Sequence, residues 1–150
     1  MRLAIDRCRE GVGAGQAPFG CAIEVAGQLV ACEHNTVVAT LDSTAHAEVN
    51  AIRAGCRAVN DIYIEGGIAA TTCEPCPMCM AALHWARVDT VYYGASIEDA
   101  VAAGFSELML PAKHVLELGG SHVRLRGGVL REDCRSLFRD WNSRSDTRLY

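Results

Sequence analysis

The strongest constraint on how this chain folds comes from two short polar segments that lie well apart in the sequence. The first contains His46 and Glu48, and the second contains Cys76 and Cys79. The two cysteines are three positions apart at the start of a predicted helix. Both sulfurs therefore lie on one face, where the positive end of the helix dipole favours a thiolate. One imidazole and two thiolates form a ligand set for zinc, so we expect the fold to bring His46 to this pair.

Three protein ligands leave the fourth position of a tetrahedral zinc ion to water, as in catalytic sites, whereas structural sites are normally closed by a fourth Cys or His. Cys73 is the available fourth ligand. It lies on the far side of Pro75, however, and no second Cys-x-x-Cys motif accompanies it. We interpret Cys73 as a buried residue at a strand end. The prediction is one catalytic Zn²⁺ per subunit, bound by His46, Cys76 and Cys79.

Glu48 follows the predicted ligand His46 by two residues, close enough to reach a water on the metal without being a ligand itself. Zinc lowers the pKa of a bound water to about 7. A neighbouring carboxylate can take a proton from that water and return it to a substrate nitrogen and a leaving amine. Glu48 is therefore the predicted catalytic residue. A non-catalytic zinc-binding interaction module, the least favoured alternative, has no use for this carboxylate.

The charge balance bears on the class of partner. The chain has 14 Lys and Arg residues against 18 Asp and Glu residues, a formal net charge of −4. This charge provides no general attraction to a polyanion. Arginines gather between residues 124 and 148, but acidic residues alternate with them, which is typical of a solvated helix face. We expect a small-molecule substrate, and the charge argues against a nucleic acid.

The apolar segments and the cysteines bear on the compartment. No run of about twenty apolar residues is present, and the first ten residues lack the apolar core of a signal peptide. Five cysteines are scattered through apolar segments, where reduced cysteine behaves as a small buried residue; they are Cys8, Cys21, Cys32, Cys56 and Cys134. We therefore expect no membrane partner and a cytoplasmic location.

Apolar periodicity and turn residues predict an opening hairpin followed by alternating strands and helices. A short helix over residues 2–10 ends in glycines, and Gly27 supplies the turn of the hairpin. The expected strands are 20–25, 28–35, 68–72, 90–93 and 123–125, and the further helices are 45–58, 76–86, 97–103 and 131–141. This order predicts a three-layer α/β domain with a mixed sheet. We assign residues 1–150 to one domain, with 131–150 as its C-terminal helix and tail.

His-Ala-Glu at 46–48 combined with Pro-Cys-Pro-Met-Cys at 75–79 is the motif of zinc-dependent nucleobase deaminases. From about residue 11 to residue 107 the chain resembles the cytidine deaminase superfamily. The resemblance implies a three-layer α/β/α fold with a mixed five-stranded sheet and an active site at two helix N-termini. It also implies a hydrolase acting on amidine C–N bonds, which replaces an exocyclic amine by oxygen and releases ammonia. Members are commonly homodimers or larger.

Within the superfamily the chain is most similar to the guanine deaminase branch. The similarity lies in Ala-Pro-Phe-Gly at 17–20, in residues 42–56 and 73–79, in Trp-Ala-Arg at 85–87, and in Asp-Ala-Val-Ala-Ala-Gly-Phe at 99–105. The last segment discriminates best, because the other branches differ there.

The resemblance also assigns residues to the substrate site; these are Asn35, Phe19, Ala47, Trp85, Glu107 and Tyr150. Each of three has a plainer interpretation: Asn35 as a turn residue, Phe19 as core and Glu107 as a solvated loop acid. Some members of the branch carry aspartate where this chain has Glu107. The tail from residue 142 to Tyr150 matches poorly apart from its end.

The predicted reaction is the hydrolysis of a free aminopurine, guanine, to xanthine and ammonia. Guanine offers ring N–H donors to Glu107, while Asn35 holds another edge of the base. The alternatives are a nucleoside deaminase acting on guanosine or cytidine, a cytosine or aminotriazine deaminase, and a tRNA adenosine deaminase. The acidic charge and the Gly104-Phe105 segment argue against the last.

Overall fold

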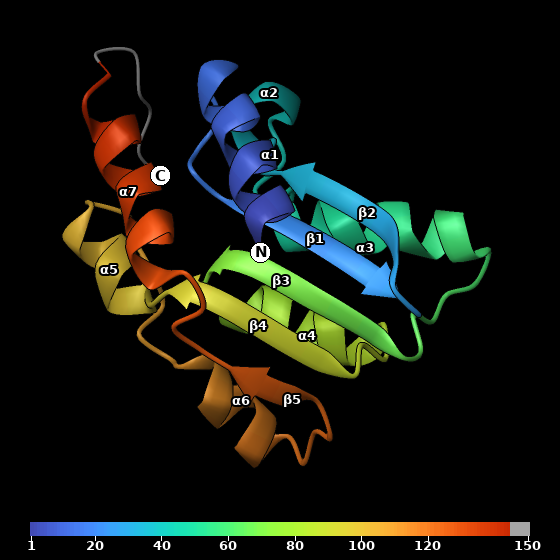
Figure 1. Cartoon of the computed structure of the whole chain (residues 1–150). Helices are drawn as coiled ribbons and strands as arrows, with labels where there is room; N and C mark the ends of the chain where they lie inside the picture. The colour runs from blue at the N-terminus through green and yellow to red at the C-terminus, as the bar shows by residue number, and fades with distance from the viewer. Residues whose placement is uncertain (145–150) are drawn as a thin grey trace.

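The computed structural model describes residues 1–144, which form three layers around a five-stranded sheet (Figure 1). The strand order is β2 (Gln28–His34), β1 (Gly20–Val25), β3 (Gly67–Cys73), β4 (Thr90–Ala95) and β5 (Arg124–Arg126). Strand β1 is antiparallel to both of its neighbours, whereas β3, β4 and β5 are parallel to one another. The predicted mixed sheet of a three-layer α/β fold is therefore confirmed.

The hairpin between β1 and β2 turns on two residues. Ala26 and Gly27 both have positive φ, at 50° and 79°, and Val25 pairs with Gln28 across the turn. Such primed turns match the twist of the strands that they join. The parallel strands need helical crossovers instead. Helix α4 (Pro77–Trp85) leads from β3 to β4, and helix α6 (Ala112–Leu118) lies between β4 and β5.

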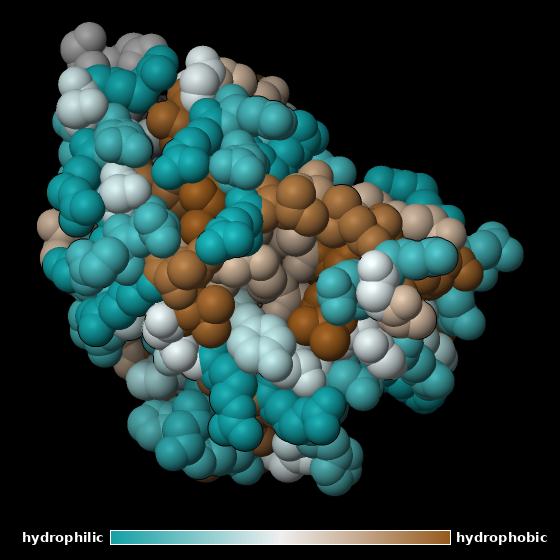
Figure 2. All heavy atoms as spheres, viewed as in Figure 1, coloured by the Kyte–Doolittle hydropathy of each residue, from teal (hydrophilic) through white to brown (hydrophobic). Residues whose placement is uncertain are grey.

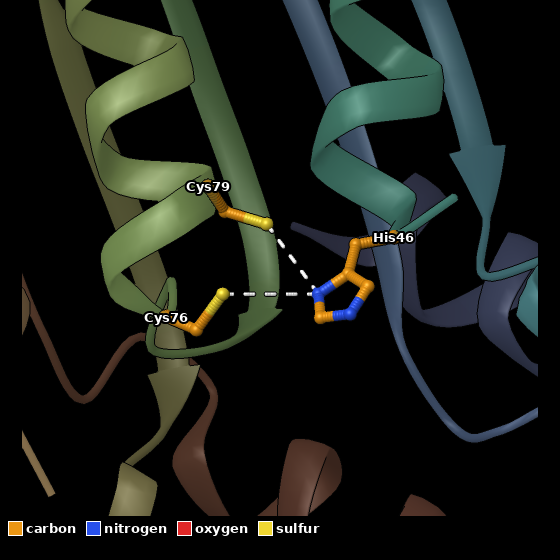
Figure 3. A group of neighbouring side chains, drawn as sticks. All are labelled: His46, Cys76 and Cys79. Atoms are coloured by element: carbon orange, nitrogen blue, oxygen red, sulfur yellow. Dashed lines mark hydrogen bonds between the residues drawn. The ribbon is translucent and has the colours of Figure 1, made fainter. Parts of the chain in front are cut away.

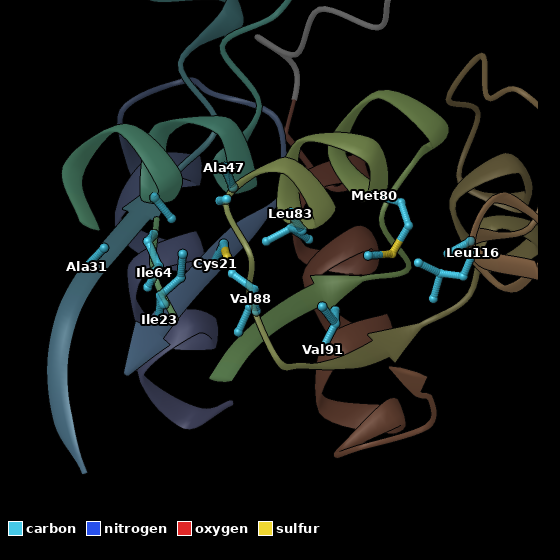
Figure 4. Close-up of a cluster of buried hydrophobic side chains, with 14 residues drawn as sticks. Cys21, Ile23, Ala31, Ala47, Ile64, Met80, Leu83, Val88, Val91 and Leu116 are labelled. Carbon is cyan, nitrogen blue, oxygen red and sulfur yellow. The ribbon is translucent and has the colours of Figure 1, made fainter. Parts of the chain in front are cut away.

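Helices α3 (Ala47–Val59), α4 and α6 cover one face of the sheet, and the main hydrophobic core lies beneath them (Figure 4). Ile23 on β1 and Val91 on β4 point from the sheet into this core, where Met80 and Leu83 of α4 meet them. All four side chains are fully buried. This packing holds α3 and α4 side by side, so that both helices begin near the same end of the central strands.

Helices α1 (Arg2–Gly13) and α7 (Arg131–Asn142) pack on the opposite face, next to the short helix α5 (Ile97–Ala102). A second core lies here, and it includes Phe105, Phe138 and Trp141. Gly20 is required for the close approach of α1 to β1, because a Cβ at this position would lie 2.2 Å from the carbonyl oxygen of Ala4. The packing of Phe105 on Phe138 and Trp141 holds the segment that follows α5 against this face.

Helices α1 and α7 leave part of this sheet face uncovered. Figure 2 shows a hollow surrounded by apolar residues at the middle of the face. A cavity of about 360 Å³ lies here, and its lining includes Leu29, Ile68 and Tyr92.

Three elements differ from the sequence-based expectations. Helix α1 continues to Gly13 and does not stop before Gly11. Gly11 serves a packing role inside this helix, because a Cβ there would lie 2.7 Å from the imidazole Cγ of His34. The four-residue helix α2 (Val37–Thr40) and helix α6 lie in segments for which no helix was predicted.

Within residues 1–144, no helix is long and apolar enough to cross a membrane.

Candidate active site

The three predicted metal ligands meet between the N-termini of α3 and α4 (Figure 3). His46 is the N-cap residue of α3 and Cys76 is the N-cap residue of α4, and both have extended backbone conformations. Pro77 occupies the first turn of α4, where its fixed φ favours helix initiation, and Cys79 lies within the same turn. Both helices therefore direct the positive ends of their dipoles at one point, which favours an anion there.

The ligand atoms have the spacing that a tetrahedral zinc ion requires. The Nδ1 atom of His46 lies 3.8 Å from the Cys76 sulfur and 3.5 Å from the Cys79 sulfur. Usual Zn–N and Zn–S bonds at a tetrahedral angle separate the nitrogen and sulfur atoms by about 3.6 Å. Among the described residues these are the ones whose ligand atoms cluster for a metal. The residues therefore fit Zn²⁺ with one coordination position left open.

Cys73 does not complete this set. It is the last residue of β3 and is buried, and its thiol donates a hydrogen bond to the carbonyl oxygen of Ser96 at 3.5 Å. Burial raises the pKa of the Cys73 thiol well above its usual value, so the side chain is protonated. The interpretation of Cys73 as a buried strand-end residue agrees with this placement.

The two ligand cysteines differ in their acidity. A hydrogen bond from the Cys79 thiol, together with the interaction with His46, lowers the pKa of Cys76 to about 4. The same hydrogen bond, together with burial, raises the pKa of Cys79. A bound divalent cation favours the thiolate form of both residues, because coordination deprotonates a thiol. One preformed thiolate next to an imidazole is a suitable entry site for such a cation.

Glu48 lies in the first turn of α3, and its side chain is buried. One of its carboxylate oxygens, Oε1, accepts a hydrogen bond of 2.9 Å from the Thr71 hydroxyl on β3. Burial and the negative charge of Cys76 raise the pKa of Glu48 above its usual value. A carboxyl group that both accepts and returns a proton works best when its pKa lies closer to the working pH. The structure therefore gives Glu48 the environment of a proton shuttle.

A small cavity of about 110 Å³ opens beside the metal ligands, and His46, Cys76 and Glu48 form one wall of it. The remaining lining comes from Phe19, Cys73, Glu74, Phe105, Ser106 and Glu107. The rings of Phe19 and Phe105 meet edge to face with centroids 5.0 Å apart. The cavity thus combines two aromatic rings with several ionisable groups.

Two of the predicted substrate residues, Phe19 and Glu107, line this cavity. Glu107 is half-buried, and burial followed by the charge of Cys76 raises its pKa. Both residues come from loops, Phe19 from the segment before β1 and Glu107 from the segment between α5 and α6. Loop residues on a rigid scaffold are common in binding sites.

Asn35 is fully buried directly after β2 and is linked to Phe19 by a backbone hydrogen bond of 3.0 Å from its own N–H to the Phe19 carbonyl. Its side-chain oxygen accepts a hydrogen bond from the Val37 N–H at 3.0 Å, which is an Asx-turn. Its side-chain nitrogen, Nδ2, has no hydrogen-bond partner in residues 1–144. A buried amide donor without a partner is costly. Asn35 itself does not line the cavity, but its backbone neighbour Phe19 does.

Trp85 does not line this cavity. It lies at the C-terminal end of α4, nine residues after Cys76, which corresponds to about 13 Å along a helix. Its indole is 75% exposed, and it lines a separate cavity together with His84 and Tyr63. Within one chain, Trp85 therefore lies away from the cavity beside the metal ligands.

The two other predicted substrate residues are placed as follows. The Ala47 side chain belongs to the main core, and Ala47 does not line the cavity beside the metal ligands. Tyr150 lies outside the described residues.

Sequence reasoning missed three residues that the structure brings to the site: Thr71, Glu74 and Phe105. The Gly104-Phe105 pair lies in a segment that resembles the family, but that resemblance assigned only Glu107 to the substrate site. Thr71 and Glu74 had none, because their roles depend on partners distant in the sequence.

Comparisons with known proteins agree with this geometry. The family model of the cytidine and deoxycytidylate deaminase zinc-binding region matches residues 1–95. Guanine deaminase of Bacillus subtilis is 43% identical over 108 residues, which cover 71% of this chain and 69% of that protein. The tRNA-specific adenosine deaminase of Aquifex aeolicus is 36% identical over 95 residues, which cover 63% of this chain and 63% of that protein.

A solved structure of guanine deaminase from Nitrosomonas europaea has a TM-score of 0.87 at 27% sequence identity, covering 95% of this chain and 82% of that chain. The likeness therefore extends to the whole fold, and the family match includes all three metal ligands and Glu48. The chain belongs to the cytidine and deoxycytidylate deaminase zinc-binding family and is a zinc-dependent deaminase of the hydrolase class.

Proposed function

We propose that this protein, as a single deaminase domain, hydrolyses guanine to xanthine and ammonia. The observation that carries the proposal is the pairing of the His46, Cys76 and Cys79 centre with a small cavity lined by the Glu107 carboxyl. The sequence similarity to a guanine deaminase over most of the chain supports it. Glu107 supplies an acceptor for the ring N–H groups of guanine, whereas the unpartnered Nδ2 of Asn35 supplies a donor for an acceptor of the same base.

The reaction adds water across the bond between C2 and a ring nitrogen and then expels the amine, so that guanine and water give xanthine and ammonia. When bound, Zn²⁺ supplies the Lewis acidity that makes water nucleophilic at neutral pH. Glu48 moves the first proton of this water to the ring nitrogen and the second to the departing amine. The hydrogen bond from Thr71 occupies Oε1, so Oε2 of Glu48 is left for this transfer.

The size of the cavity favours a free base over a nucleoside or an RNA loop. Its volume of about 110 Å³ is well below the roughly 300–1,000 Å³ of sites for drug-sized ligands. A free base therefore fits this cavity, whereas the ribose of a nucleoside would have to lie outside it. The second candidate function is RNA editing, because tRNA adenosine deaminases are among the relatives. The net charge of −4 argues against it, because it provides no general attraction to RNA.

We include a homodimer in the proposal. Large apolar side chains are exposed on α4, on α6 and on the loop between α5 and α6; these are Trp85, Leu118, Leu108 and Met109. Helices α4 and α6 pack against each other, so the exposed residues occupy neighbouring elements. Apolar patches of this kind mark protein contacts. Light scattering should give twice the chain mass of 16.1 kDa, and the mass of one chain would refute the dimer.

We also place the protein in the cytoplasm, because none of its eight cysteines forms a disulfide. Localisation of a tagged protein in its native cells tests this assignment.

The test of the substrate is an ammonia-release panel with the zinc-loaded protein. Guanine, guanosine, cytosine, cytidine, adenine, ammeline and a tRNA anticodon stem are compared at equal concentration by kcat/KM. We expect guanine to exceed every other compound by at least about tenfold, because only a guanine base satisfies both Glu107 and Asn35 and the small cavity leaves the ribose of guanosine outside. A higher value for the anticodon stem or for cytidine would overturn the proposal.

A variant separates recognition of the base from the chemical step. Glu107→Gln replaces one hydrogen-bond acceptor by a donor, and we expect kcat/KM for guanine to fall by about 100-fold or more while the zinc content is unchanged. The exposed acid Glu117 on α6 provides the matched control as Glu117→Gln. Unaltered kinetics in Glu107→Gln would show that Glu107 is a solvated loop residue and does not bind the substrate.

A further inference from the structure

The loop that carries Phe105 and Glu107 connects the end of α5 to the start of α6. Packing on Phe19, Phe138 and Trp141 holds the Phe105 ring. No such aromatic cluster holds the part of the loop after Phe105, where Leu108 and Met109 are exposed. The position of Glu107 therefore depends on how the two flanking helices are attached to the zinc site.

Both helices are attached through one side chain, Glu74, which lies two residues before the ligand Cys76. Oε1 of Glu74 accepts a hydrogen bond of 2.9 Å from the Ala112 N–H at the start of α6. Oε2 accepts one of 3.4 Å from the Ile97 N–H at the start of α5. The backbone N–H of Glu74 donates to the Ala95 carbonyl at 2.8 Å. A single carboxylate thus joins the zinc-ligand loop to two helix N-termini.

The attachment matters most for α6, because that helix has no cap of its own. Its N-cap residue is Pro111, whose side chain makes no capping hydrogen bond. Helix α5 has a local capping box formed by Ser96 and Asp99. Glu74 therefore supplies α6 with an acceptor that its local sequence lacks, and its negative charge lies at the positive ends of both helices. Glu74 also lines the cavity beside Glu107.

We propose that Glu74 is a positioning residue that fixes the distance of Glu107 from the metal centre, because it holds the start of α6, where the 103–111 loop ends, and the start of α5, the helix that precedes this loop. The inference rests on the proposed function in one respect, namely that Glu107 binds the substrate. Because both oxygens of Glu74 accept backbone N–H groups, the residue acts through the loop and takes no part in proton transfer. Misplacement of a binding group by about 1 Å is enough to lower turnover efficiency strongly.

The first test is a double-mutant cycle in the zinc-loaded protein. Glu74→Gln retains only one acceptor oxygen, and we expect kcat/KM for guanine to fall about tenfold, mostly through KM, with Glu74→Ala lower still. In a Glu107→Gln background the Glu74→Gln change should cost less than about twofold, because the loop then has no carboxylate to position. Glu117→Gln on α6 is the control for loss of a negative charge. Additive losses, or zinc lost from Glu74→Gln, would overturn the proposal.

The second test does not depend on activity. Hydrogen–deuterium exchange of the peptide spanning residues 104–112 should be faster in Glu74→Gln than in the unaltered protein, while peptides from α3 and β1 exchange as before. Uniform acceleration across the chain, or no change in this peptide, would contradict the anchoring role. Because this readout needs no substrate, it remains decisive if guanine is not turned over and the proposed function fails.

Discussion

Glu48 and Thr71 illustrate how much of the proposed chemistry depends on single side chains. Glu48 is buried between the start of α3 and β3, where its carboxylate accepts the hydrogen bond from Thr71. The motif His-x-Glu indicated Glu48 from the sequence, because its spacing from the ligand is local. Thr71 could not be found in this way, because it lies on a strand 23 residues later in the chain and only the fold brings it to Glu48.

Glu48→Gln should abolish turnover without affecting the metal. Glutamine has nearly the same shape but cannot accept and return a proton, so we expect kcat to fall by at least about 1,000-fold. Zinc content should remain at one ion per chain, because Glu48 is not part of the ligand cluster. Metal analysis and steady-state rates measured on one preparation check both parts. Activity within tenfold of the unaltered protein would exclude Glu48 as the proton shuttle.

Thr71→Val removes the hydroxyl that orients Glu48 but keeps the β-branched shape that suits a strand. We expect kcat to fall about tenfold and KM to change less than twofold, because the hydrogen bond acts on the proton-transfer step. Thr71→Ser restores the hydroxyl and should recover most of kcat. If the serine variant is as slow as the valine variant, packing and not hydrogen bonding explains the effect.

At the scale of elements, the site is a meeting of two helix N-termini. Each helix has a metal ligand, His46 or Cys76, at its N-cap position, which a Ser, Thr, Asp or Asn residue normally occupies. Neither ligand makes a side-chain capping hydrogen bond. The first turns of both helices therefore direct their positive dipole ends at the metal-ligand cluster.

The elements that were predicted from the sequence are those with a local pattern of apolar or turn residues. The hairpin with Gly27 and the helices containing Val49, Leu83 and Leu137 were predicted, because their apolar spacing is regular. Helix α6 was missed because its capping group is Glu74, 38 residues earlier. Long-range partners, which no local pattern encodes, account for the remaining errors.

Asp99 links two elements, and its removal should lower stability. Its Oδ2 accepts hydrogen bonds from the Ser96 N–H at 3.0 Å and the Arg131 Nε at 3.1 Å, while Oδ1 meets the Arg135 Nε at 3.1 Å. Asp99→Ala removes one of the two hydrogen bonds of the α5 capping box and the ion pairs to α7, so we expect a loss of about 1–2 kcal/mol at pH 7. Chemical denaturation measures this, with exposed Asp140 replaced by Ala as control.

The effect of Asp99 should also depend on pH. Burial acts to raise its pKa, but the hydrogen bonds from Arg131 and Ser96 outweigh burial and hold it below its usual value. A folded-state pKa below the unfolded-state value of about 4 means that the stabilisation is present above pH 4 and is lost as the pH falls through the folded value. The stability difference between the unaltered protein and Asp99→Ala should therefore shrink below pH 4. A difference that stays constant down to pH 2 would contradict the ion-pair account.

At the scale of the whole molecule, the two cores keep separate parts of the site in place. The core beneath α3, α4 and α6 fixes the metal ligands, while the core around Phe105, Phe138 and Trp141 fixes the wall of the cavity. Glu74 lies where the zinc-ligand loop meets the helices of the other wall. Glu74 therefore connects the wall that carries Glu107 to the loop that carries the metal ligands.

The most direct test of the whole account is metal removal and restoration with guanine as substrate. The zinc-loaded protein should release xanthine and ammonia in equal amounts. Removal of zinc by a chelator should reduce the rate to background, because His46, Cys76 and Cys79 then hold no Lewis acid. One equivalent of Zn²⁺ per chain should restore it. Undiminished xanthine formation by zinc-free protein, or no xanthine from the fully zinc-loaded protein, would contradict the account.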